Sequence, residues 1–133
     1  MTNRPRQPQR ISGAQGDLDG RARALLPLRP ADLQVLLVLG DGPLHPYGIS
    51  KAAESVGGRV TLEIGSLYRT LNRLRTLGLI EPAPSGERGP QGQERRTWQI
   101  TEFGHAVARA EAERLQEVLE AARSRKLLRD PAP

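Results

Sequence analysis

One stretch, residues 60–101, constrains the fold more than any other part of the chain, because a helical pattern changes there to an extended one. Over residues 64–77, apolar residues recur at spacings of three, four and three, which predicts a helix with one apolar stripe. The stripe comprises Ile64, Leu67, Leu71 and Leu74. Gly78 is a natural end for this helix, because glycine readily adopts the left-handed conformation that follows many helices.

Two extended segments follow this helix, at residues 79–83 and 94–100, with the glycine- and proline-rich sequence PSGERGPQGQ between them. This order predicts a β-hairpin with a long connection. Trp98 and Ile100 are two residues apart in the second segment, so both side chains should point to the same, inward face.

Two more helices are predicted before the hairpin. Pro30 suits the first position of a helix, and the leucine-rich sequence ADLQVLLVLG predicts that this helix ends near Gly40. A shorter helix spans residues 46–56, and its apolar face comprises Ile49, Ala53 and Val56. Three helices followed by a hairpin form a winged helix-turn-helix, so the fold is expected to be mainly α-helical with a small β-hairpin.

The C-terminal part predicts a long last helix that begins after Thr101, a suitable N-cap, and ends near Leu128. Small residues and leucines recur along it at alternating spacings of four and three, which is typical of paired helices. This seam comprises Ala108, Ala112, Leu115, Leu119 and Ala122. Because the helix is longer than the small body it would cover, we expect it to pair in a homodimer. The alternative is that the seam packs only on its own domain.

The N-terminal residues are rich in arginine, proline and glycine and show little periodicity, so we expect a disordered basic arm. The predicted organisation is therefore an arm over residues 1–28, a winged helix-turn-helix over 29–101, a dimerisation helix over 102–128 and a tail over 129–133.

Composition narrows the class of protein. The chain has 133 residues, which suits one domain with tails, and a formal net charge of +5. A basic balance favours an anionic partner, of which nucleic acid is the commonest. The absence of cysteine excludes disulfides, thiolate metal sites and cysteine nucleophiles. No apolar run is long enough to span a membrane and no secretory signal is visible, so we expect a cytoplasmic, nucleoid-associated protein.

Neither a metal site nor a catalytic site is expected. His45 and His105 are the only histidines and belong to different predicted elements, so they do not suggest metal ligands. The glycines of the hairpin tip lack the lysine and the strand-to-helix context of a phosphate-binding loop. No nucleophile and base pattern or cofactor motif is present, so the chain is not expected to be an enzyme.

The outward face of the 64–77 helix carries the chemistry. If Leu67 and Leu71 point inward, a set of polar residues points outward, with Tyr68 and Arg75 on the flanks. The outward set is Ser66, Arg69, Asn72 and Arg73. Arginine can bond guanine and asparagine can bond adenine in a bidentate way, while a serine near a helix N-terminus can hold a phosphate. The alternative is that these are ordinary solvated side chains.

The predicted wing adds three arginines that could contact the DNA backbone or the minor groove, namely Arg88, Arg95 and Arg96. The function expected from these residues is sequence-specific binding of double-stranded DNA. An alternative is a winged helix that binds an acidic protein partner through the same basic face.

Three segments together resemble the PadR-like family of bacterial transcriptional regulators, over about residues 27–128. They are HPYGISKAAESVGGRVTLEIGSLYRTLNRLRTLGLIE, ERRTWQITEFG and EAERLQEVLEAARSRKLL. The resemblance implies a homodimeric winged helix with a C-terminal dimerisation helix, usually a repressor of nearby genes. Many members of the family lose affinity for DNA when a small aromatic or drug-like molecule binds near the dimer interface. The chain is similar to the shorter subfamily, which has a single C-terminal helix.

The resemblance also bears on single residues. It places Tyr47 and Lys51 near a DNA phosphate, although Tyr47 could equally be a packing residue. The sequence departs from the family pattern at Pro46, at Glu63 before the third helix, and at Trp98, where paired tyrosines are common. Trp98 is interpreted first as core between the wing and the last helix, and alternatively as an aromatic wall for a planar ligand.

Overall fold

The computed structural model describes residues 6–56, 62–84 and 96–129, with side chains from Gln15 onward. Five helices and two strands are present in these ranges. In chain order they are α1 (Arg6–Arg23), α2 (Pro30–Leu39), α3 (Pro46–Ala53), α4 (Ile64–Thr76), β1 (Ile80–Ala83), β2 (Thr97–Ile100) and α5 (Glu102–Ser124). The central order of three helices, a hairpin and a final helix confirms the predicted winged helix-turn-helix, with one further helix at the N-terminus.

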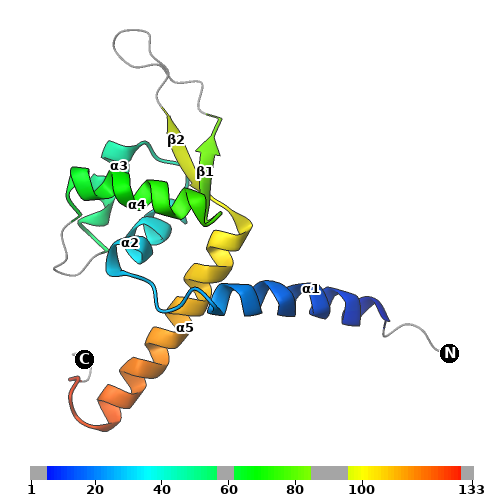
Figure 1. The fold of residues 1–133 in the computed structure, drawn as a ribbon. Coiled ribbons are helices and arrows are strands. Elements are labelled where there is room, and N and C mark those ends of the chain that lie inside the picture. Colours follow the sequence, from blue (N-terminus) through cyan, green and yellow to red (C-terminus); the bar gives the residue numbers. More distant parts are fainter. Residues whose placement is uncertain (1–5, 57–61, 85–95, 130–133) are drawn as a thin grey trace, which may run out of the picture.

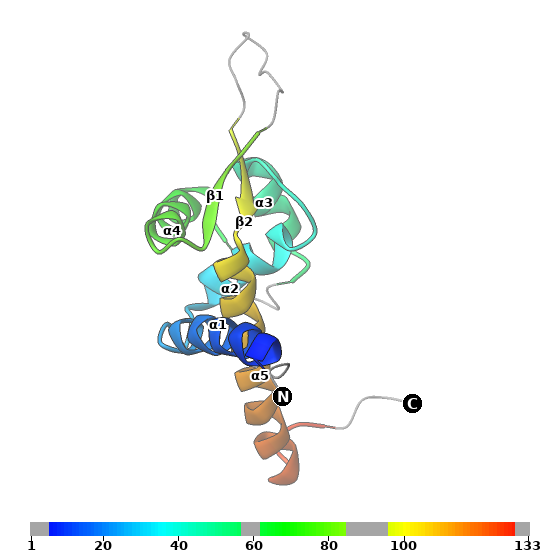
Figure 2. The same ribbon diagram turned by 90° about the vertical axis from the view of Figure 1, so that its right-hand side faces the viewer.

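The body of the molecule is formed by α2, α3 and α4 packed beside the hairpin (Figure 1). Figures 1 and 2 both show the hairpin rising at one end of the molecule and α5 running away from the body at the other. Helix α4 lies at the edge of the body, with one side against α2 and α3 and the other side uncovered (Figure 2). This arrangement leaves the outer face of α4 beside the hairpin.

Strands β1 and β2 are antiparallel, with Pro82 opposite Trp98. The sheet has a further partner that the sequence did not suggest. Leu44, in the connection between α2 and α3, exchanges two backbone hydrogen bonds with Trp98, at 3.1 and 2.8 Å. The backbone of Trp98 is therefore paired on both sides, with Pro82 of β1 and with Leu44.

The hydrophobic core joins one face of each helix in the body. Its largest fully buried aliphatic side chains are Val35, Leu36, Leu39, Ile49, Leu67, Leu71, Leu74, Leu79, Ile80 and Val107. The predicted stripe of the third helix is confirmed at three of its four positions. Ile64 is exposed, because α4 begins at this residue and its packed part starts one turn later. Val56 is also exposed, because α3 ends at Ala53 and does not carry it.

The prediction of a disordered N-terminal arm is wrong for Arg6–Arg23, which form α1. Helix α1 packs on α5: Ala22 is fully buried, and the Arg21 guanidinium lies 4.8 Å from the centre of the Phe103 ring. Leu18 is partly buried against the same core. Leu18 and Ala22 are four residues apart in the sequence, which is a helical spacing. The arginines and glycines around them show no such periodicity, so the helix was not predicted.

The start of α5 is held tightly against the hairpin. Thr101 caps the helix as predicted, since its hydroxyl accepts a hydrogen bond from the Gly104 backbone N–H at 2.9 Å. A side chain at Gly104 would collide with the Leu79 carbonyl and with Ile100, so only glycine allows this close approach. Gly78, which ends the preceding helix, has a φ of 81°, the left-handed conformation expected of it.

The predicted seam on α5 is only partly covered. Ala108 packs against the core of its own chain, whereas Leu119 is 48% exposed and its neighbour Val118 is 50% exposed. Ala112 is also exposed, and Leu115 and Ala122 are half-buried. The first part of the seam therefore packs within its own chain. The part beyond Leu115 lies on the segment of α5 that projects from the body (Figure 1).

Candidate nucleic-acid interface

Helix α4 presents two clearly different faces. Leu67, Leu71 and Leu74 are buried against the body, so the opposite face points into solvent. Arg69 and Asn72 are exposed on that face, and Ser66 is half-exposed near the start of the helix. No hydrogen bond or ion pair of the Arg69 guanidinium or the Asn72 amide is present among the described residues. Both groups are available to bind an external ligand.

Arg73 does not belong to this free face. Its guanidinium forms a salt bridge with the carboxylate of Asp32 on α2, and that carboxylate is buried. The interpretation of Arg73 as a DNA contact is therefore corrected: the side chain reaches back into the body because a buried carboxylate requires a partner. Asp32 was not singled out from the sequence, since an acid in the first turn of a helix usually needs no tertiary partner.

The start of α3 adds an aromatic and a cationic group to the same region. His45 caps this helix, with its Nδ1 accepting from the Gly48 backbone N–H at 3.2 Å. The ring of Tyr47 is stacked near that of His45, with centroids 6.5 Å apart, and Tyr47 is 69% exposed. The interpretation of Tyr47 as a packing residue is wrong. Lys51 is exposed one turn further along α3.

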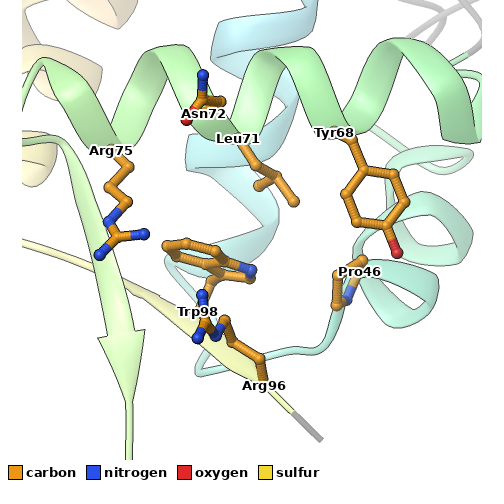
Figure 3. A pocket seen from close by; sticks show the side chains of 7 residues that line it. All are labelled: Pro46, Tyr68, Leu71, Asn72, Arg75, Arg96 and Trp98. Carbon is orange, nitrogen blue, oxygen red and sulfur yellow. The ribbon is translucent and has the colours of Figure 1, made fainter.

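The wing contributes Arg96, which is exposed at the start of β2. The other two wing arginines of the prediction, Arg88 and Arg95, lie outside the described residues. Arg96 and Arg75 of α4 both lie over the indole of Trp98, at 5.9 and 5.7 Å from the ring centroid. Such cation–π contacts hold both guanidinium groups near the indole, on the side of α4 opposite the Asn72 amide (Figure 3).

Trp98 is buried, with 7% of its surface exposed, and its ring faces α4 (Figure 3). The prediction of a core position is confirmed, but the ring packs beneath α4 and does not point to the last helix. Beside it is a hollow of about 410 Å³, which we call the Trp98 pocket. Its lining residues are Pro46, Tyr68, Leu71, Asn72, Arg75, Arg96 and Trp98.

A second charged contact lies away from this face, at the base of α5. Glu111 is 2% exposed and accepts hydrogen bonds from the Leu28 backbone N–H, at 2.9 Å, and from Arg114. The hydrogen bond from Arg114 lowers the pKa of Glu111, although burial opposes this change. The sequence did not single out Glu111, because a glutamate on a long charged helix gives no sign of being buried.

The ranges 6–56, 62–84 and 96–129 hold no group of three potential metal-ligating side chains, and His105 is exposed on α5. Of the helices described, none combines the length and the apolar character needed to cross a membrane.

Comparison with known proteins agrees with this geometry. The sequence model of the transcriptional regulator PadR-like family matches residues 35–110, more than half of the chain. A stretch of 82 residues is 40% identical to an uncharacterised 37.1 kDa protein in transposon TN4556 of Streptomyces fradiae. That match covers 62% of this chain and only 22% of the transposon protein.

Two solved structures share the fold. A PadR-like transcriptional regulator from Bacillus cereus superposes with a TM-score of 0.60 at 18% identity, covering 80% of this chain and 96% of the other. A mutant of MarR from E. coli gives 0.60 at 18% identity, over 96% and 87% of the two chains. These two likenesses show the shared winged-helix fold. The family match shows that the chain belongs to the PadR-like family of transcriptional regulators, which bind DNA and are not enzymes.

Proposed function

We propose that this protein is a homodimeric repressor that recognises a specific operator through α4 and is released from it by a small aromatic ligand. In this proposal Arg69 and Asn72 contact base edges in the major groove, because their polar groups match guanine and adenine. Lys51, Tyr47 and Arg96 contact the phosphate backbone on either side.

The observation that carries the proposal is the division of α4 into two faces. Three leucines anchor one face in the core, and the Asp32–Arg73 salt bridge ties the same helix to α2. Arg69 and Asn72 then project from a rigid support, which is what base recognition requires. Ser66 and the uncovered Gly65 allow a phosphate to approach the helix N-terminus closely, where the helix dipole favours negative charge.

Support for a dimer comes from the far half of α5. Val118 and Leu119 are about half exposed on a helix that projects from the body, and burying such residues against a second copy would be favourable. Two copies of α4 in successive major grooves would be separated by roughly 34–36 Å, so the operator should be a palindrome with that half-site spacing.

The proposal is tested with the promoter upstream of the protein's own gene. We expect a specific mobility shift that survives excess competitor DNA, and reduced transcription of that promoter in a purified system. Lys51→Ala should weaken binding to all sequences and reduce the salt slope by about one unit, because one phosphate contact is lost. No specific shift, together with an acidic protein that co-purifies with the chain, would instead favour a protein-binding role.

A further inference from the structure

We infer that Arg75 and Arg96 together bind one phosphate of the DNA backbone, and that Trp98 is the positioning residue that holds both guanidinium groups for it. We call the two arginines with their shared indole the arginine clamp. The inference rests on the proposed entry of α4 into the major groove. It adds Arg75 to the DNA contacts and makes the wing and α4 share a single contact.

The two arginines come from different elements and meet at one ring. Arg75 extends from the last turn of α4, and Arg96 immediately precedes β2. Their guanidinium groups lie 5.7 and 5.9 Å from the centroid of the Trp98 ring (Figure 3). Because Trp98 is buried and its backbone is paired on both sides, the ring gives both side chains a common support.

The positive charge of the clamp is not balanced by the protein. Arg75 and Arg96 are both exposed, and neither is paired with an acidic side chain in the ranges 15–56, 62–84 and 96–129. The described residues that line the Trp98 pocket include no acid. Two like charges held beside one ring repel each other, and the electron-rich face of the indole offsets only part of this repulsion. A phosphate between the guanidinium groups removes the repulsion and accepts hydrogen bonds from both.

The position of the clamp on α4 suits a phosphate of the DNA backbone. The major groove is about 12 Å wide, close to the diameter of a helix with its side chains, so a helix in the groove has a phosphate backbone along each flank. Figure 3 shows the Asn72 amide pointing away from Trp98 and the Arg75 side chain reaching toward it. With Asn72 directed to the bases, Arg75 and the wing lie beside the same strand.

Trp98 acts through the arginines and does not touch DNA, since only 7% of its surface is exposed. A side chain that is ordered before it binds loses less conformational entropy on binding. The cation–π contacts with Trp98 order both guanidinium groups in the free protein. The indole therefore increases the affinity for DNA by preparing the phosphate site.

The shared phosphate is tested with the full chain and a random-sequence duplex, from the dependence of the affinity on salt concentration. Arg75→Ala and Arg96→Ala should each weaken binding roughly threefold to fivefold. Together they should reduce the salt slope by about one unit in total, because one phosphate is no longer neutralised. Arg109→Ala on α5 is the control and should behave as the wild type. A fall of about two units would overturn the sharing, and unchanged affinity and slope in the double variant would overturn the clamp.

The positioning role of Trp98 is tested by a mutant cycle. Trp98→Leu should weaken binding to the random duplex roughly threefold to tenfold in the wild-type background, and should cause no further loss when both arginines are alanine. Trp98→Phe keeps an aromatic ring and should retain most of the affinity. Equal losses in the two backgrounds would overturn the positioning role, because general damage to the wing does not depend on the arginines.

A second measurement leaves the ring unchanged. Trp98 is the sole tryptophan, so its indole N–H gives a single resonance in the NMR spectrum of the chain. Random DNA should shift this resonance in the wild type and shift it much less in the variant that lacks Arg75 and Arg96. Equal shifts would contradict a phosphate bound at the clamp.

Failure of the clamp and failure of the proposed function give different results. A phosphate contact carries no sequence information, so the ratio of operator to random-DNA affinity should be unchanged in the clamp variants. If the wild type had no operator preference while the double variant still lost one unit of salt slope, the proposed function would fail and the clamp would stand. Operator preference in a chain whose clamp variants bind random DNA as the wild type does would have the opposite meaning.

Discussion

Helices α4 and α5 both carry apolar residues at helical spacing, but only α4 has its stripe covered by its own chain. Leu67, Leu71 and Leu74 are buried, whereas Val118 and Leu119 remain about half exposed. A covered stripe fixes which face of a helix points outward, and on α4 that face bears Arg69 and Asn72. An exposed stripe does not determine which face of a helix points outward within one chain, so the role of the far half of α5 depends on a second copy.

The largest expected effect is a difference in the free energy of unfolding between substitutions on α4 and on α5. Leu67→Ala should reduce the free energy of unfolding by about 2–5 kcal/mol, because it leaves a cavity in a fully covered position. Leu119→Ala is the matched control, and at low protein concentration it should have almost no effect. Urea denaturation followed by circular dichroism measures both. Equal losses for the two variants would contradict the difference drawn between the helices.

Assembly gives the next effect. Leu119→Glu places a charge in the proposed dimer interface, and we expect the dimer dissociation constant to rise roughly a hundredfold, equivalent to about 2.7 kcal/mol. Sedimentation equilibrium measures the change, while unfolding of the dissociated chain should be unaffected. Glu117→Gln, on the same projecting segment, is the control. A wild-type chain that stays monomeric would remove the proposed role of this seam.

The Asp32–Arg73 salt bridge tests how α4 is held. Asp32→Ala leaves Arg73 without its partner and should reduce the free energy of unfolding by about 1–3 kcal/mol. Replacing both residues with apolar side chains, Asp32→Leu with Arg73→Met, should restore most of this loss, since neither charge then needs a partner. Additive losses in the double variant would show that the two residues act independently.

The smallest effect concerns the part of α5 that is tied to its own chain. The pKa of Glu111 is held below its ordinary value of 4.5 mainly by the hydrogen bond from Arg114. A lowered pKa means that ionised Glu111 stabilises the fold at pH values above 4.5, and that this contribution disappears as the pH falls through the folded-state pKa.

We therefore expect Glu111→Gln to lower the free energy of unfolding at neutral pH and to differ progressively less from the wild type below pH 4.5. Equilibrium denaturation across this pH range measures the difference, with Glu113→Gln as an exposed control on the same helix. A constant difference at all pH values would show that the ionised form of Glu111 contributes nothing.

Periodicity predicted the winged-helix part because local pattern and tertiary burial agree there. The stripe on α4, the stop at Gly78 and the cap at Thr101 follow from residue type and spacing alone. Features that depend on contacts between distant segments could not be predicted in this way. Examples are the backbone pairing of Leu44 with Trp98, the burial of Glu111 and the salt bridge that removes Arg73 from the outer face.

Helix α1 was missed for a related reason. Its composition resembles that of disordered segments. Its few apolar residues become buried only because α1 packs on α5, and this contact cannot be predicted from local sequence. The sequence suggested Trp98 as a ligand wall or as core. In the folded chain the ring is buried, as the core interpretation requires, and it also borders a hollow.

The most direct test of the central claim is the ratio of operator to random-DNA affinity for the double variant Arg69→Ala with Asn72→Ala. We expect each substitution to remove about 1–3 kcal/mol of preference for the operator, with a smaller loss on random DNA. Arg109→Ala on α5 removes a charge far from α4 and should leave the ratio unchanged. An unchanged ratio in the double variant would contradict the claim that the outer face of α4 reads the sequence.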